Sequence, residues 1–259
     1  MDREPPSRTG SKPSAVGVFP ATTRFLSNPL MGGAESDWSP VHEAAVNGRL
    51  LTLRNLIGQV DGVTTDWHTP LFNACVSGSQ DCVKLLLEYG ASPHPVCDLA
   101  SPIHEAAKRG HVECIESIVA HGGDIDYHIS RLGTPLYLAC QNMQIACVRK
   151  LLQSGANVNR GRDLEAPLHA VARASSGELA NLLMDFGADI QAKNAEGKRP
   201  LDLLSPDDPL FHLFLQRKEP PSLMQLCRLR VRKCFGIQQH HKINGLLLPD
   251  ELKNFLLHL

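Results

Sequence analysis

The chain has 259 residues, and its 26 lysines and arginines against 27 aspartates and glutamates give a formal net charge of -1 at pH 7. This balance argues against a surface that wraps nucleic acid, and we expect no nucleic-acid partner. No apolar run approaches the roughly 18 residues of a membrane helix, and the opening Met1–Pro6 segment cannot serve as a signal core, so we expect no membrane partner. Eight cysteines without a C-x-x-C pair favour free thiols in the cytoplasm.

A proline preceded by a small or polar residue recurs along the chain at nearly constant intervals. The six prolines are Pro40, Pro70, Pro102, Pro135, Pro167 and Pro200. They are separated by 30, 32, 33, 32 and 33 residues, a period typical of helical repeats. Proline suits the first position of a helix because it lacks an N–H group, and a preceding serine or threonine can cap the first turn. Each proline therefore predicts the start of a helix.

A second apolar stretch ends seventeen residues after each of the first five prolines. In the five units, this stretch ends at Ile57, Leu87, Val119, Leu152 and Met184. Val148 and Leu151 in one such stretch follow helical spacing, and the Gly155-Ala156 step after it suits the end of a helix. Small pairs such as Ala106-Ala107 in the first helix let neighbouring helices approach closely. Two helices and a turn thus form one unit.

These residues resemble the ankyrin repeat, whose T-P-L-H-x-A-A and L-L-x-x-G-A signatures recur between about residues 36 and 204. The resemblance implies an all-α solenoid of about six units, each a helix pair with a projecting hairpin finger stacked on its neighbours. The last unit keeps Arg199-Pro200-Leu201 and then begins a short helix at Asp208-Pro209, which we expect to be a cap. We assign residues 36–218 to an ankyrin-repeat domain with a C-terminal cap. Residues 1–35, rich in proline, serine and glycine, are predicted to be a disordered tail.

The first unit has a shorter loop than the others. Ile57 precedes Pro70 by 13 residues, whereas the corresponding loops elsewhere have 15 or 16, and the Gly-Ala step is missing. Because the seventeen-residue helical part is complete, we expect the shortage to lie in the loop from Gly58 to Asp66. A deletion that joins two units out of register explains it. A natural irregular finger is the alternative.

The last segment, residues 219–259, resembles a SOCS box, which predicts a small helical unit. The order of tail, ankyrin stack and box resembles the ankyrin repeat and SOCS box family. The family's elongin-binding pattern implies elongin-binding roles for Ser222, Leu223, Leu226, Cys227 and Val231. The family's cullin-recruiting pattern implies cullin-binding roles for Leu246, Leu248 and Pro249. Leu247 stands between them where a proline is usual.

This resemblance implies a non-catalytic substrate receptor of a ubiquitin ligase. Its partners would be elongin C with elongin B, cullin-5 with its RING subunit, and a client protein held by the ankyrin stack for ubiquitination and proteasomal degradation. Three segments resemble one family member in particular: Phe25–Leu30, Asp37–Pro40 and Gly236–His241. This likeness implies a creatine kinase as client, although nothing in the residue pattern selects that enzyme. The alternative is an ankyrin scaffold or inhibitor that sequesters its partner without ubiquitin transfer.

Apolar residues three places before the prolines mark the predicted finger tips. They are Trp67, Leu99, Leu132 and Leu164. Apolar tips are unusual on a solvated surface, so we interpret them as a client-binding stripe, with Trp38 and Trp67 as aromatic anchors. Packing of one finger on the next is the alternative. In the tail, Phe25 and Leu26 begin an apolar island that either binds the client or caps the first repeat.

Two His-Glu pairs resemble the start of a zinc-protease helix, but the residues one turn after His42 and His104 are Val46 and Lys108, which cannot complete a metal site. The repeat explains both pairs as helix starts. Cysteines also recur at matching positions of two units, as Cys75 with Cys82 and Cys140 with Cys147, and buried thiols explain them better than redox pairs. We therefore expect no catalytic site, no metal and no cofactor.

Overall fold

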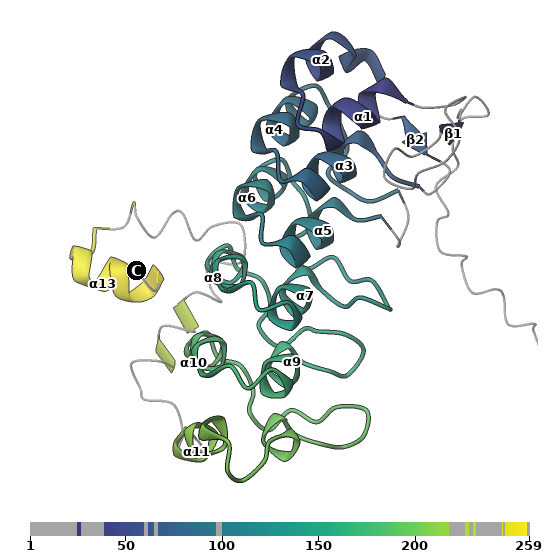
Figure 1. Cartoon of the computed structure of the whole chain (residues 1–259). Helices are drawn as coiled ribbons and strands as arrows, with labels where there is room; N and C mark the ends of the chain where they lie inside the picture. The colour runs from purple at the N-terminus through teal and green to yellow at the C-terminus, as the bar shows by residue number, and fades with distance from the viewer. Residues whose placement is uncertain are drawn as a thin grey trace, which may run out of the picture.

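The computed structural model describes residues 25–26, 39–59, 62–64, 67–96, 100–217, 226–227, 230–231, 245 and 247–257. The described residues form paired helices stacked in two layers, and hairpin fingers project from the side of the first layer (Figure 1). Among them, no helix is both long enough and apolar enough to cross a membrane. The predicted fold class, an all-α ankyrin solenoid, is confirmed.

The first helix of each unit begins at its predicted proline. These helices are α1 (Pro40–Val46), α3 (Pro70–Ser77), α5 (Pro102–Arg109), α7 (Pro135–Gln141) and α9 (Pro167–Arg173). The hydroxyl oxygens of Thr69 and Thr134 accept hydrogen bonds of 3.1 and 3.2 Å from the backbone N–H groups of Phe72 and Tyr137. Threonine caps therefore start α3 and α7, as the sequence predicts.

The second layer contains one helix from each unit. These are α2 (Leu50–Asn55), α4 (Gln80–Glu88), α6 (Val112–Ala120), α8 (Ile145–Gln153) and α10 (Gly177–Asp185). Each buries one apolar stripe, such as Val148, Leu151 and Leu152 on α8, while the fully buried Ala106 and Ala107 let the layers approach. One continuous core therefore runs along the stack, and each unit packs on its sequence neighbours.

The stack ends in a modified unit. Pro200 begins the short 3-10 helix η4 (Pro200–Leu203) instead of an α-helix. It is followed by α11 (Pro209–Gln216), where the Asp208 carboxylate accepts a 2.8 Å hydrogen bond from the Leu210 N–H group. Leu210 and Phe214 are buried against the end of the core, so α11 closes the stack. The final helix of the chain is α13 (Asp250–Leu257).

The first unit differs from the others in its helix as well as in its loop. Helix α2 ends fifteen residues after its proline, whereas α4, α6, α8 and α10 end eighteen residues after theirs. A 3-10 turn, η3 (Ile57–Gln59), replaces the missing end. The prediction that the helical part is complete in this unit is therefore wrong, because the chain leaves the helix one turn early.

A two-stranded parallel sheet lies beside the first fingers. Strand β2 (Val63–Thr64) pairs with β1 (Phe25–Leu26), with Phe25 opposite Val63 and Leu26 opposite Thr64. The pairing fixes the backbone of β1 within the range predicted to be a disordered tail. The other residues of that tail lie outside the described part of the chain.

Candidate interaction surfaces

A cavity of about 460 Å³ opens beside the first-layer helices, next to a finger. Its lining includes Phe72, Ser101, His104, Glu105, Lys108 and Leu132, followed by Leu138, Gln141 and Asn142 on and just after α7. Glu105 and Leu138 both stand three residues after the proline of their unit, and Lys108 and Gln141 both stand six after it. The repeat therefore places these positions in a row along the first layer, and we call this row, together with its cavity, the groove.

The predicted finger-tip residues are not equivalent in the structure. Leu132 is half-buried and lines the cavity, whereas Leu164 is 67% exposed. Trp67 is half-buried and adopts a left-handed backbone with φ 64°, which is uncommon for a large residue. Leu99 and Trp38 lie outside the described residues, and for Phe25 and Leu26 only the backbone is described. The structure thus brings one predicted residue, Leu132, into the groove.

Buried histidines connect the first helices of the first, third and fifth units to the next finger, whereas the second unit has Phe72 at this position. Nε2 atoms of His42, His104 and His169 lie 3.1, 3.0 and 3.1 Å from backbone carbonyl oxygens. The acceptors are His68, Gly133 and Lys198, each two residues before the next proline. Burial lowers the pKa of both His42 and His104 to about 4, so these imidazoles are neutral at pH 7. Within the described residues, no cluster of three His, Cys, Asp or Glu side chains could hold a metal ion.

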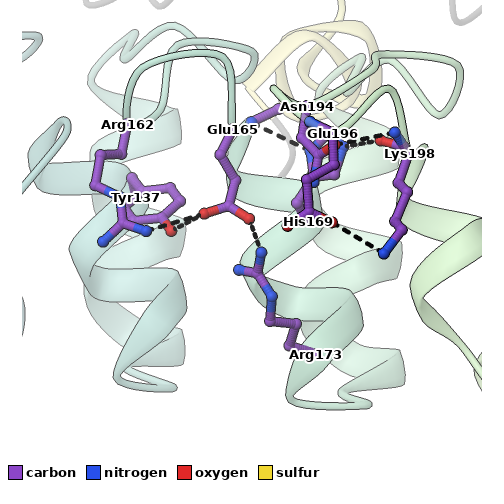
Figure 2. Close-up of polar contacts among 9 residues, drawn as sticks. Tyr137, Arg162, Glu165, His169, Arg173, Asn194, Glu196 and Lys198 are labelled. Carbon is purple, nitrogen blue, oxygen red and sulfur yellow. Dashed lines mark hydrogen bonds and ion pairs between the residues drawn. The ribbon is translucent and has the colours of Figure 1, made fainter.

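In the fourth unit, a tyrosine replaces this histidine, and a carboxylate replaces the carbonyl (Figure 2). The Tyr137 hydroxyl donates a 2.5 Å hydrogen bond to Oε2 of Glu165, which stands two residues before Pro167. Arg173 pairs with the other carboxylate oxygen, and Arg162 Nη2 lies 3.4 Å from Oε2. The guanidinium of Arg162 also lies 5.5 Å from the centre of the Tyr137 ring. Two units are therefore joined by a cluster in which Tyr137 and Glu165 are buried and the two arginines are partly exposed.

The cluster shifts the ionisation of both buried groups. Burial would raise the pKa of Glu165, but hydrogen bonds from Arg173 and Tyr137 and the charges of Arg173 and Arg162 outweigh it and lower that pKa. Burial, together with the bond to Glu165, raises the pKa of Tyr137 to about 12. This cluster is not among the sites predicted from the sequence. Its signal was the coincidence of two departures from the repeat pattern, Tyr137 and Glu165, at positions that stacking places together.

The C-terminal segment is described only in part. Leu226 and Cys227 are exposed in a short helical stretch, and Val231 is half-buried. Leu247 is fully exposed, while Leu248 is half-buried just before Pro249 and α13. The remaining predicted elongin and cullin contacts, Ser222, Leu223 and Leu246, lie outside the described residues. Large apolar side chains in this segment are thus left in contact with solvent.

Known proteins resemble the chain over most or all of its length. Human ankyrin repeat and SOCS box protein 9 is 61% identical over 295 aligned positions that cover 100% of both chains. The mouse protein of the same name is 60% identical, covering 91% of this chain and 93% of its own. The solved human ASB11 ankyrin repeat domain is 43% identical with a TM-score of 0.62, covering 71% of this chain and 100% of that chain.

The human alignment also contains positions that this chain lacks. Its 295 positions exceed the 259 residues of this chain by 36, which is about one repeat of ~33 residues. Sequence models of known families match both parts of the chain: "Ankyrin repeats (3 copies)" matches residues 20–97 and 92–162, and "SOCS box" matches residues 219–257. The chain therefore belongs to the ankyrin repeat and SOCS box family.

Proposed function

We propose that the chain is the substrate-recognition subunit of an elongin B/C and cullin-5 RING ubiquitin ligase. The match of residues 219–257 to the SOCS box carries this proposal, because that box implies a substrate receptor. The exposed Leu226 and Cys227 supply apolar surface suited to a partner. The ankyrin stack holds the client, and ubiquitin transfer is performed by the other subunits. We place the complex in the cytoplasm, where the six described cysteines, all free thiols, would stay reduced.

The groove along the first layer is the proposed client site. It offers apolar surface mainly at the half-buried Leu132, with the almost fully buried Leu138 and the hydrogen-bonding groups of Gln141 and Asn142 beside it, a mixture typical of binding sites. The finger tips Trp67 and Leu164 would extend this surface, as would Leu99, Trp38, Phe25 and Leu26 from the sequence prediction. The likeness to protein 9 implies a creatine kinase as client.

Elongin binding tests the ligase assignment. A leucine buried in a partner pocket contributes about 1.5–3 kcal/mol, so the double variant Leu223→Ala, Cys227→Ala should weaken elongin B/C binding by about tenfold or more. The exposed Arg230 provides the control, and Arg230→Ala should bind as the wild type does. Undiminished co-purification of elongins with the double variant would refute the assignment.

A scaffold or inhibitor that sequesters its client is the second candidate, and Leu247 favours it. This residue occupies a place where the cullin-recruiting pattern has proline, and its side chain is fully exposed. Reconstitution with elongins, cullin-5 and its RING subunit separates the two functions: a ligase receptor transfers ubiquitin to bound creatine kinase, whereas a scaffold binds it unmodified. If Leu247 weakens cullin binding, Leu247→Pro should increase the rate of transfer.

A further inference from the structure

The groove carries charged side chains at one recurring position. Six residues after the proline, Lys108 stands near the end of α5, Gln141 at the end of α7 and Arg173 at the end of α9, whereas the first two units have Val46 and Val76 there. Lys108 and Gln141 both line the cavity. Because stacked repeats place equivalent positions in a row, Arg173 lies on the continuation of the same groove, one unit further along.

Each of these two cations covers a carboxylate that is turned towards the protein. Lys108 Nζ lies 3.9 Å from Glu105, and their side chains are 51% and 14% exposed. Arg173 pairs with Glu165, and their side chains are 49% and 9% exposed. The positive groups therefore face the solvent, and the negative groups lie beneath them.

The cations also outnumber the carboxylates at both places. Glu105 is shared by Lys108 and Arg109, with 2.5 Å between Arg109 Nε and Oε1. Glu165 is shared by Arg162 and Arg173. Each place thus has two positive charges against one negative charge.

Two further acidic groups on these fingers do not cancel the excess. Asp163 is exposed and has Arg160 and Arg162 close to it in the sequence, and Glu196 forms its own ion pair with Lys198 at 2.9 Å. The groove wall therefore presents a net positive potential to whatever lies in it.

We propose that the groove binds an extended acidic segment of the client protein. One client carboxylate would lie against Lys108 and a second against Arg173, with an apolar side chain between them on Leu132 and Leu138. This inference rests on the proposed function, since it names the chemistry of the client that the stack recognises. Charge complementarity of this kind selects partners and speeds their association.

The repeat geometry sets the spacing of the two client carboxylates. Neighbouring packed helices lie about 8–10 Å apart, so equivalent positions on α5 and α9, two steps along, are about 16–20 Å apart. An extended chain advances about 3.3 Å per residue, so five or six residues separate the two acidic groups. The expected client segment therefore has two acidic residues at this separation and an apolar residue midway.

Synthetic peptides test this chemistry with the full chain. The first peptide carries two glutamates six residues apart with a leucine midway, and the second carries glutamines in their place. Measured by fluorescence anisotropy, the acidic peptide should bind about tenfold more tightly, and the difference should shrink as salt is added. Equal binding of the two peptides, or no binding of either, would overturn the proposal.

Matched variants locate the effect in the groove. Lys108→Gln with Arg173→Gln should abolish the preference for the acidic peptide, and glutamine can still donate a hydrogen bond to Glu165. The control is Lys84→Gln with Arg149→Gln, which removes two exposed cations from α4 and α8 in the second layer and should keep the preference. If both pairs of substitutions had the same effect, the groove would not be the binding site.

Two further measurements separate this inference from the proposed function. Elongin binding by the groove variant should equal that of the wild type, and a circular dichroism spectrum equal to that of the wild type would show that its ankyrin stack is folded. If creatine kinase fails to bind while the peptide preference holds, the client in the proposed function is wrong and the groove chemistry stands. If creatine kinase binds the groove variant and the wild type equally, the acidic-segment proposal is wrong and the receptor role stands.

Discussion

Tyr137 and Glu165 form a hydrogen bond across the boundary between two repeat units, with 2.5 Å between the phenolic oxygen and Oε2. The corresponding boundaries after the first, third and fifth units are bridged by a histidine and a backbone carbonyl, as in His104 and Gly133. In the fourth unit, the same two positions therefore make the contact between units, but a phenol and a carboxylate replace the imidazole and the backbone carbonyl. A carboxylate at this position can also bind the two arginines, Arg162 and Arg173, which a carbonyl could hold less strongly.

The first prediction concerns the hydroxyl of this tyrosine. Tyr137→Phe removes one hydrogen bond to a charged group and leaves Glu165 paired with its arginines, so the free energy of unfolding should fall by about 1.5–3 kcal/mol. Urea denaturation measures the change. Tyr89 is 52% exposed, and Tyr89→Phe should change stability by less than about 0.5 kcal/mol. Equal effects of the two substitutions would contradict the role assigned to the bond.

A repeat sequence predicts the starts of helices better than it predicts contacts between units, and the Tyr137–Glu165 cluster illustrates the difference. The prolines predicted the starts of α1, α3, α5, α7 and α9 because proline at the first helical position is a local signal. Tyr137 and Glu165 are 28 residues apart, and their contact depends on the stacking of two units. Groove residues such as Lys108 become apparent only when equivalent positions are aligned in space. The pairing of β1 with β2 likewise depends on a partner distant in the sequence.

The second prediction concerns stability in mild acid. His104 has its pKa lowered to about 4 by burial, whereas in the unfolded chain it takes up a proton near 6.5. The unfolded state therefore binds more protons between these values, and stability falls as the pH is lowered through this range. From pH 7.5 to pH 5 this group alone should cost about 2 kcal/mol.

A substitution isolates the contribution of this histidine. His104→Gln should be less stable than the wild type at pH 7.5, because the bond to Gly133 changes, but should lose about 2 kcal/mol less on acidification. The exposed His94 serves as control, and His94→Gln should keep the wild-type loss. Urea denaturation at the two pH values gives both quantities. A wild-type pH dependence in His104→Gln would show that other groups cause it.

The third prediction concerns unpaired polar atoms at the first junction. Among the described residues, four buried side-chain polar atoms have no hydrogen-bond partner: Ser39 Oγ, His42 Nδ1 and both polar atoms of Asn73. In the third unit, the residues equivalent to Ser39 and His42 do pair, with 2.9 Å between Ser101 Oγ and His104 Nδ1. The unsatisfied groups thus gather where α1 packs on α3, as expected if two units that were not neighbours have been joined.

Asn73 gives the sharpest test of this mismatch, since its whole amide is buried and unpaired. An unsatisfied buried polar group costs about 1–3 kcal/mol, so Asn73→Leu should raise the free energy of unfolding by about 1 kcal/mol or more. Asn142, whose Nδ2 donates a 2.9 Å hydrogen bond to the Leu138 carbonyl, is the matched control. Asn142→Leu should be neutral or destabilising. A loss of stability in Asn73→Leu would indicate a partner for this amide.

The fourth prediction is that the first unit opens before the middle of the stack. A terminal unit packs against one neighbour instead of two, which makes it less stable. In this chain the second helix of the first unit is also only six residues long, and buried polar atoms at its junction with the second unit lack hydrogen bonds. Hydrogen exchange should therefore be faster for residues 40–55 than for residues 102–185. Uniform protection across both ranges would count against a deletion and favour a natural irregular finger.

The last prediction concerns recognition of the proposed client if the short first loop is a deletion of about one repeat. The SOCS box follows the far end of the stack, and stacked units contact only their neighbours, so elongin binding should not depend on the first junction. The groove between Lys108 and Arg173 is also intact. Trp38 and the tail, however, would be displaced by about one unit relative to Trp67. When a few anchor residues contribute most of the binding energy, displacing one of them by a whole unit should lower the affinity for the client.

Insertion of a consensus repeat of about 33 residues near Gly58 should therefore raise the affinity for the proposed client, a creatine kinase. The inserted unit would separate α1 from α3 and pack against both, and the side chains of Ser39 and Asn73 should then gain hydrogen-bond partners. Hydrogen exchange in the first unit should therefore also become slower. Elongin affinity should stay within about twofold, or roughly 0.4 kcal/mol. Calorimetric titration of both proteins with client and with elongins measures these values. Equal client affinity with and without the insert would place recognition entirely in the units from Pro70 onward.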